Sequence, residues 1–308
     1  MDVHSYHKRR SEIAGLPWHP YKAPKEHHLL LDRRRFHYLE WGEAGQPLYV
    51  FLHGGSQNAW TWDTVCQHLA RDHHCVALDL RGHGESEWAY DQDYRVAAFV
   101  SDLAQFLDRM PEKPVLVGMS LGGLTALNYA LEHSHILSGL VCVDVAPNAT
   151  VSAAKPIREF VSEGFKLTRF EDFVDAAARF NTRRQKELLA FSMRRSLRRL
   201  VSGHHTWKTD PQMRHAVDAF AVNMSDIAGQ VHKITCPTLL VRGGDSAVVS
   251  QAQADAFVAS LPDGRSCTVP NAGHSVQGDN PKGLIAALKD FEAVLPPRRQ
   301  RSGGVDQQ

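Results

Sequence analysis

The sequence predicts an α/β protein with a doubly wound, mostly parallel sheet and an inserted block of helices. Short, nearly continuous apolar runs alternate with helical patterns over residues 26–147 and again over 231–296. Strands of this kind are typical of parallel sheets that helices cover on both faces. Between residues 148 and 230 the strand signals vanish and only helical patterns remain. We therefore expect a two-part core of 26–147 and 231–296 around a helical insertion of 148–230, with an extended N-terminal arm over 1–25 and a disordered polar tail over 297–308.

The individual elements follow from hydrophobic spacing and from the prolines that end helices. Residues 96–110 carry apolar side chains at helical spacing, and Pro111 and Pro114 follow them. Further helices are expected at 60–71, 124–132 and 281–294 in the core, and at 156–164, 170–179, 185–200 and 211–224 in the insertion. Strands are expected at 36–41, 48–53, 75–80, 114–117, 139–145, 237–245 and 266–274.

Ser120 is the strongest candidate for a reactive residue. It stands at the centre of Gly118-Met119-Ser120-Leu121-Gly122, between an apolar strand and a helical run. This is the G-x-S-x-G pattern of a nucleophile elbow, in the strand-to-helix context that the pattern requires. A side chain at Gly118 or Gly122 is expected to clash with the neighbouring strand or helix, which explains the two glycines.

A base and an acid for Ser120 are expected at the ends of two later strands. His274 follows a strand that ends in a Gly-His turn and is the candidate base. Asp245 follows a buried strand that ends in a Gly-Gly-Asp turn and is the candidate acid, which would fix the imidazole tautomer. Asp144 at the end of the 139–145 strand is the competing carboxylate. We favour Asp245 because of its turn, and interpret Asp144 as a residue that anchors a loop.

With these motifs the chain resembles the α/β-hydrolase superfamily, in its serine hydrolase branch with a helical cap. The resemblance covers roughly residues 25–295 and includes the chain order Ser, Asp, His. It also rests on the strand that ends in His53-Gly54-Gly55 and on the loop at 79–86, Asp-Leu-Arg-Gly-His-Gly-Glu-Ser. It implies the α/β-hydrolase fold, with the 148–230 helices as the cap, but it does not specify a substrate.

The resemblance also implies where an oxyanion hole and a substrate pocket would lie. The backbone N–H of Leu121, directly after the nucleophile, is one expected donor, and the N–H of Gly55 is the other. Ser56 is the alternative donor and a candidate substrate contact, and Met119 is expected to line the pocket. His53 is expected to pin the oxyanion loop rather than to take part in catalysis.

Composition restricts the class of partner and the location. The net charge is +1 with 22% charged residues, so neither nucleic acid nor a membrane surface is expected as a partner. The first ten residues lack the apolar segment of a signal peptide, and no apolar run reaches about 18 residues. Five scattered cysteines without C-x-x-C spacing indicate free thiols in a reducing compartment, so we expect a cytoplasmic protein. A homodimer is left open.

The insertion is rich in arginine, and two interpretations stay open. A cationic cap suits recognition of a carboxylate, because arginine binds carboxylates with two parallel hydrogen bonds. The alternative is a solvated basic helix face. The arginines concerned are Arg183, Arg184, Arg194, Arg195, Arg198 and Arg199.

The sequence as a whole predicts a serine hydrolase that cleaves a small or medium carboxylic ester or lactone through an acyl-enzyme. The triad chemistry requires neither a metal nor an organic cofactor. A carbon–carbon bond hydrolase of vinylogous diketones is the nearest alternative, since it uses the same triad and a similar cap. A small-molecule receptor on the same fold is the alternative from outside the enzymes.

Overall fold

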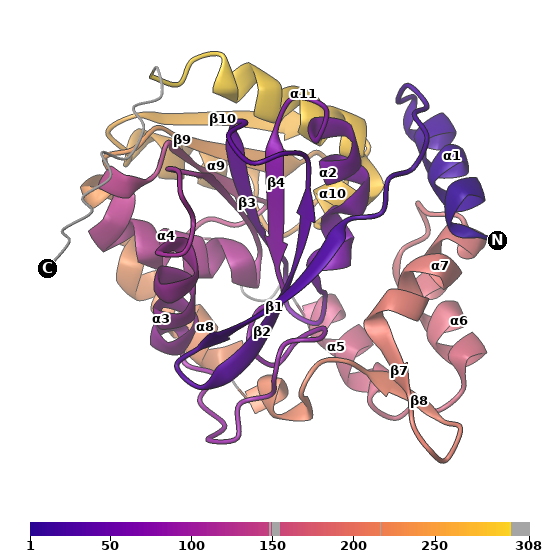
Figure 1. Cartoon of the computed structure of the whole chain (residues 1–308). Coiled ribbons are helices and arrows are strands. Elements are labelled where there is room, and N and C mark those ends of the chain that lie inside the picture. The colour runs from indigo at the N-terminus through magenta and orange to yellow at the C-terminus, as the bar shows by residue number, and fades with distance from the viewer. Residues whose placement is uncertain (148, 150–154, 216, 297–308) are drawn as a thin grey trace, which may run out of the picture.

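The computed structural model describes residues 1–147, 149, 155–215 and 217–296 (Figure 1). The tail expected over 297–308 lies outside these residues, as does part of the start of the expected cap. The described chain divides into a central sheet with helices on both faces, a helical cap to one side of it, and an N-terminal helix beside the cap (Figure 1).

The predicted α/β class with a mostly parallel sheet is confirmed. Within the described residues the main sheet has eight strands in the order β1-β2-β4-β3-β5-β6-β9-β10. β1 and β2 form an antiparallel edge, and every pair from β4 to β10 is parallel. The strands are β1 (Lys25–Leu31), β2 (Arg34–Trp41), β3 (Leu48–Leu52), β4 (His74–Leu78), β5 (Val115–Met119), β6 (Gly139–Val143), β9 (Thr238–Gly243) and β10 (Gly264–Val269).

Helices close both faces of the sheet because each presents an apolar side to it. One hydrophobic cluster joins strand residues to α3, α4 and α9, and a second joins the opposite face to α2 and α11. β3 to β6 are buried at every position, as expected for strands covered on both faces. The helices of the core are η1 (Ala59–Trp62), α2 (Asp63–Leu69), α3 (Val96–Leu107), α4 (Leu121–His133), η2 (Ser134–Ile136), η5 (Val231–Lys233), α9 (Gln251–Ala259), α10 (Val276–Asp279) and α11 (Pro281–Glu292).

The cap follows β6, and one part of it differs from the expected pattern. A helix was expected over 185–200, but the helix ends at Ser196 and a two-stranded hairpin follows, which turns at Gly203 with φ 85°. Leu197 and Trp207, one from each strand, are buried with Phe173 in a separate cap core. The cap elements are α5 (Lys155–Gly164), α6 (Phe170–Phe180), α7 (Lys186–Ser196), β7 (Leu197–Arg199), β8 (His205–Trp207), η4 (Pro211–His215) and α8 (Val217–Ala228).

The N-terminal segment is not the extended arm that its composition suggested. Residues Val3–Ala14 form helix α1, which the Asp2 side chain caps by accepting the Ser5 N–H at 3.0 Å, and which ends at Gly15 with φ 61°. α1 packs against both α2 of the core and α7 of the cap (Figure 1). Its buried face carries Tyr6, His7, Arg10 and Ser11. Because that face is mainly polar, hydrophobic spacing could not reveal the helix.

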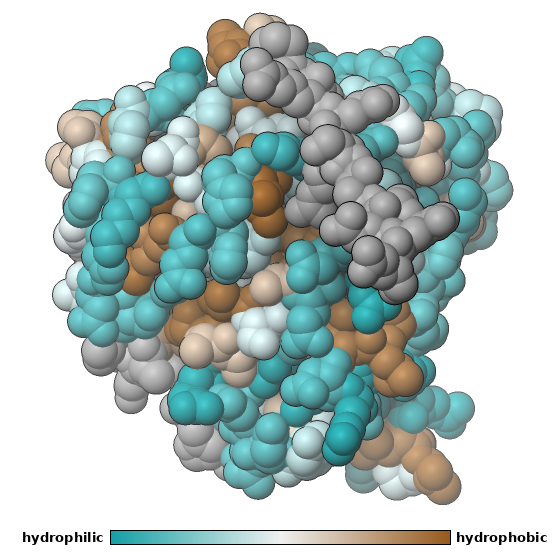
Figure 2. Space-filling model, turned by 60° about the vertical axis from the view of Figure 1, so that its left-hand side comes forward, coloured by the Kyte–Doolittle hydropathy of each residue, from teal (hydrophilic) through white to brown (hydrophobic). Residues whose placement is uncertain are grey.

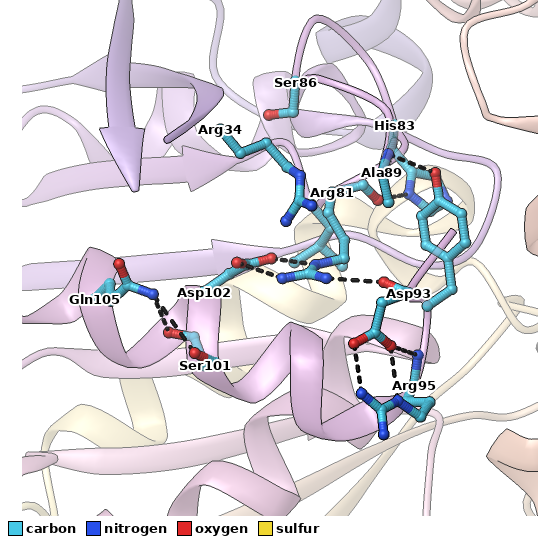
Figure 3. Close-up of polar contacts among 12 residues, drawn as sticks. Arg34, Arg81, His83, Ser86, Ala89, Asp93, Arg95, Ser101, Asp102 and Gln105 are labelled. Atoms are coloured by element: carbon cyan, nitrogen blue, oxygen red, sulfur yellow. Dashed lines mark hydrogen bonds and ion pairs between the residues drawn. The ribbon is translucent and has the colours of Figure 1, made fainter. Parts of the chain in front are cut away.

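The loop after β4 links the core to the cap. The buried Arg81 guanidinium donates two parallel hydrogen bonds to Asp102 of α3, at 2.5 and 2.6 Å, and a third to a backbone carbonyl at 2.8 Å (Figure 3). The carbonyl of Gly82, a residue with φ 75°, accepts the backbone N–H of Asp210 in the cap at 2.8 Å. This loop is held in place by the buried Arg81 and, through the carbonyl of Gly82, forms a hydrogen bond to the cap.

The surface contains both hydrophilic and apolar residues. Figure 2 shows a face on which hydrophilic residues predominate and apolar residues lie between them in separate patches. Within the described residues, every helix is too short or too polar to cross a lipid bilayer.

Candidate active site

Ser120 occupies a strained turn at the junction of β5 and α4. Its backbone has φ 50° and ψ −114°, a region that side-chain-bearing residues rarely adopt. A Cβ at Gly118 would stand 2.4 Å from the carbonyl oxygen of Gly122, and a Cβ at Gly122 would stand 2.4 Å from that of Leu52. The steric reason predicted for the two glycines is therefore confirmed.

His274 lies against a buried carboxylate, and that carboxylate belongs to Asp144. The His274 Nδ1 atom is 2.8 Å from Oδ2 of Asp144, whose side chain is fully buried. Two more donors hold the same carboxylate: the Ser246 hydroxyl at 2.5 Å and the backbone N–H of Gly243 at 3.1 Å. Because a carboxylate only accepts, Nδ1 of His274 carries the proton and Nε2 is left as the basic nitrogen.

The expectation that Asp245 is the partner of His274 is wrong. The Asp245 carboxylate is half exposed and pairs with Arg183 at 3.3 Å instead. The Gly-Gly-Asp turn that pointed to Asp245 does contribute, but through its neighbours, since Gly243 and Ser246 hold Asp144. Asp144 thus replaces Asp245 as the residue that contacts the base, and it does not serve as a simple loop anchor.

The predicted oxyanion loop borders the elbow. Gly54 approaches so closely that a Cβ there would lie 2.5 Å from Sδ of Met119 and 3.3 Å from Cβ of Ser120. A Cβ on the exposed Gly55 would meet no atom within 4 Å. Leu121 is the first residue of α4, where backbone N–H groups lack a partner within the helix. Both expected donors thus belong to segments that adjoin Ser120.

His53 takes the structural position that was predicted for it. Its Nδ1–H donates to the Gly54 carbonyl at 2.8 Å, and its Nε2 accepts the Leu80 N–H at 3.0 Å. Complete burial lowers the pKa of His53, which agrees with a neutral ring that makes one bond as donor and one as acceptor. The ring therefore ties the oxyanion loop to the loop after β4.

Gln57 is a member of the site that no sequence motif indicated. Its Oε1 accepts the Gly54 N–H at 3.2 Å and a hydrogen bond from Gln277 at 3.3 Å. Its Nε2 donates to the Ser275 hydroxyl at 3.3 Å, in the residue after His274. One side chain therefore connects the oxyanion loop to the segment that carries the base.

A cavity of about 670 Å³ lies between the core and the cap, and Gln57 is one of its lining residues. Its wall includes Ser120 and His274, together with the predicted lining residues Gly55, Ser56, Met119 and Leu121. The cap helices α5, α6 and α7 contribute apolar side chains to the rest of the wall, among them Phe160, Phe180 and Leu188. Two lining residues that the sequence did not suggest are Tyr6 and Arg10 of α1.

Among the residues that the structure describes, no three His, Cys, Asp or Glu side chains are arranged to hold a metal ion. The cavity wall contains a serine in a strained turn and a histidine whose Nδ1 contacts a fixed, buried carboxylate. These are the components of nucleophilic catalysis assisted by a general base.

Known proteins share this architecture. The family model of the alpha/beta hydrolase fold matches residues 47–281. An esterase of Mycobacterium tuberculosis is 34% identical over 269 residues, which cover 82% of this chain and 84% of that protein. The pimeloyl-[acyl-carrier protein] methyl ester esterase of Edwardsiella ictaluri is 31% identical over 252 residues, or 80% of this chain and 94% of the relative.

Structural comparison gives the same result. A solved structure of the Mycobacterium tuberculosis esterase matches with a TM-score of 0.74 and 28% identity, and covers 95% of this chain and 99% of the other. Both the family match and the identity to these relatives extend over most of the sequence. The chain belongs to the α/β-hydrolase family.

Proposed function

We propose that this hydrolase cleaves a small or medium carboxylic ester or lactone with a triad of Ser120, His274 and Asp144. The observation that carries the proposal is the 2.8 Å contact between His274 Nδ1 and the buried Asp144 carboxylate, in the wall of the cavity that also holds Ser120. The esterase relatives support an ester as the bond that is cleaved.

In the first step His274 acts as the general base. With Nδ1–H held by Asp144, Nε2 takes the proton of the Ser120 hydroxyl while the oxygen attacks the carbonyl carbon. The imidazolium that forms lies beside the Asp144 carboxylate, which stabilises its charge. Return of this proton to the departing alkoxide leaves an acyl-enzyme, and a water molecule activated by the same histidine then releases the acid.

The developing oxyanion would be stabilised by two backbone N–H groups, those of Leu121 and Gly55. Leu121 offers an N–H at the positive end of α4. Gly55 belongs to a loop that His53 and Gln57 hold against the elbow. Such a fixed pair of donors requires no reorganisation during the reaction, and the loss of one typically lowers kcat about 10²–10³-fold.

The substrate is expected to be of moderate size and largely apolar. A cavity of about 670 Å³ lies within the range of sites for small molecules. All five cysteines are free, which supports a reducing compartment such as the cytoplasm as the place of action.

The test is the turnover of p-nitrophenyl esters of rising acyl chain length, with lactones and one vinylogous diketone alongside. Wild type is compared with Ser120→Ala and with Ser192→Ala, in which a cavity serine of the cap is changed. We expect Ser120→Ala to lose ester turnover by at least about 10⁴-fold and Ser192→Ala to stay within about threefold.

Each outcome assigns the function differently. The chain length at which turnover collapses measures the reach of the cavity. Cleavage of the diketone without ester turnover would move the assignment to a carbon–carbon hydrolase. Ester turnover that survives in Ser120→Ala would remove the elbow from the mechanism, and negligible turnover on every compound would favour a receptor.

A further inference from the structure

The cavity wall has an excess of positive charge. Five arginines line it, Arg10, Arg158, Arg183, Arg184 and Arg195, whereas the described carboxylates in the wall are those of Asp63 and Asp279. Arg183 pairs with Asp245, which lies outside the wall, but a buried cation that lacks such a partner is costly.

Both wall carboxylates are already engaged. Asp279 accepts hydrogen bonds from Arg184 at 2.8 Å, from Asn181 at 3.0 Å and from the backbone of Gly273 at 3.0 Å. Asp63 lies 3.0 Å from Nε2 of His7. Neither carboxylate forms an ion pair with Arg10 or Arg195 among the described residues.

Arg10 is one wall cation that lacks a carboxylate partner in the described chain. Its side chain projects from α1 into the cavity wall, is 6% exposed, and donates to the carbonyl of Gly278. Among the described residues it forms no ion pair with a carboxylate. Burial, and after it the positive charge of Arg184, lowers the pKa of Arg10 to about 10, so the group stays charged at neutral pH.

A second cation stands in the same wall without a carboxylate partner in the described chain. The Arg195 guanidinium lies 3.6 Å from the centre of the Trp60 ring. Stacking on an aromatic face leaves the edge of the guanidinium, with its N–H groups, free for another acceptor. Arg195 comes from α7 and Arg10 from α1, two helices that pack together.

We propose that Arg10, assisted by Arg195, forms a subsite for a carboxylate group, so that the preferred substrates are esters that carry a free carboxylate at the far end of their chain. This inference rests on the proposed esterase function and narrows its substrate class. The fork of the arginine side chain matches the two oxygens of a carboxylate, and the surrounding apolar wall suits the hydrocarbon chain between the two groups.

The position of Arg10 agrees with this assignment. Gly278, which its guanidinium contacts, belongs to α10 and follows His274 by only four residues. Ser120, His274 and Arg10 line the same cavity, so an ester at Ser120 and the guanidinium share one enclosed space, and the chain length of the best substrate would measure their separation.

The experiment compares mono-p-nitrophenyl esters of adipic, suberic and sebacic acids with neutral p-nitrophenyl alkanoates of matched length. Chains of this length avoid rapid attack of the substrate's own carboxylate on its ester. The readout is the ratio of kcat/KM for the charged ester to kcat/KM for its neutral twin, in wild type, Arg10→Gln and Arg9→Gln. Arg9 is the matched control, since it lies on the same helix with a half-exposed side chain that pairs with Glu12 at 3.7 Å.

We expect Arg10→Gln to lower this ratio at least about tenfold, mainly through KM, while Arg9→Gln leaves it unchanged. Adipate should also inhibit wild type competitively and raise its Tm, and should do neither for Arg10→Gln. If Arg10→Gln fails to fold, the wild-type ratio, adipate inhibition and Arg195→Gln provide the test, and a lower ratio in Arg195→Gln supports the subsite.

Neutral esters that turn over well while charged ones are at least tenfold poorer in wild type, with no inhibition by adipate, would overturn the carboxylate subsite and leave the esterase proposal intact. An equal effect of Arg10→Gln on both series would likewise overturn it. Failure of wild type to cleave either series would instead overturn the esterase proposal.

Discussion

The change from Asp144 to Asn is the sharpest test of which carboxylate serves His274. The substitution keeps the size of the side chain and removes its charge. It also makes it possible for the amide to donate a hydrogen bond to Nδ1, which would move the ring proton to Nε2. The nitrogen that accepts the proton of Ser120 in the proposed mechanism would then already carry one.

The size of the effect can be worked out from the geometry. The donor and acceptor atoms are 2.8 Å apart, and the Asp144 side chain is fully buried. With an effective dielectric constant of about 20, two unit charges at that distance attract by about 6 kcal/mol. At 1.36 kcal/mol for each power of ten, loss of this attraction in the transition state lowers kcat by about 10⁴-fold.

Asp245→Asn is the matched control, because the same chemical change is made at the carboxylate of the neighbouring strand end. Asp245 and its partner Arg183 are each nearly half exposed, and such pairs contribute about 0–1 kcal/mol to stability. We expect kcat within about threefold of wild type.

The assay is kcat with p-nitrophenyl butyrate, together with the rate at which a fluorophosphonate labels Ser120, after circular dichroism has shown both variants to be folded. A larger loss in Asp245→Asn than in Asp144→Asn would refute the reasoning, and would mean that Asp245 replaces Asp144 during the reaction.

Three further changes test the scaffold. Gly122→Ala places a methyl group 2.4 Å from a carbonyl oxygen of β3, so urea denaturation should show that the free energy of unfolding falls by at least ~2 kcal/mol. In Gly55→Ala the methyl group meets no atom within 4 Å, so the free energy of unfolding should stay within ~0.5 kcal/mol of wild type. The reverse order would contradict the steric account. Arg81→Met leaves Asp102 buried without its ion-pair partner and should lower the free energy of unfolding by about 3–5 kcal/mol. Adding Asp102→Leu to the same chain should restore most of this stability, and additive losses in the double variant would contradict the importance of the pair. Burial lowers the pKa of His83 to about 3, so below about pH 6.5 the unfolded chain binds a proton that the folded chain does not. As the pH decreases, the free energy of unfolding therefore falls by up to ~1.4 kcal/mol per pH unit. In His83→Gln the free energy of unfolding should depend less steeply on pH between pH 6 and 4, and an unchanged dependence would exclude His83 as its source.

The elbow and the sheet were predictable because their signals are local. Buried strands appear as apolar runs, and Gly118-Met119-Ser120-Leu121-Gly122 encodes the steric requirements of the turn within five residues. The choice between Asp144 and Asp245, by contrast, could not be made from local signals. β6 and β9 are adjacent parallel strands, so both carboxylates follow strands that end at the same edge. Which of them faces His274 depends on the direction of a side chain, and spacing does not encode that direction.

For two of the elements that escaped prediction the physical reason is clear. Helix α1 buries a polar face, whose contacts are the approach of His7 to Asp63, stacked rings and the Arg10 guanidinium, so it has no apolar stripe. The cap hairpin has two strands of three residues each, too short for an alternating pattern to stand out from a helical one. Both elements take their stability from partners that are distant in the sequence.

At Ser120 the side chain that the proposed reaction requires also lowers thermal stability, because it stands on a strained backbone. A non-glycine residue with φ 50° and ψ −114° stores about 1–3 kcal/mol of strain. Glycine would relieve that strain and would also remove the proposed nucleophile. A library of this chain that is screened for thermal tolerance alone would therefore tend to enrich inactive proteins at residue 120. Engineering of a more stable variant should select for turnover and stability together, or keep Ser120 unchanged.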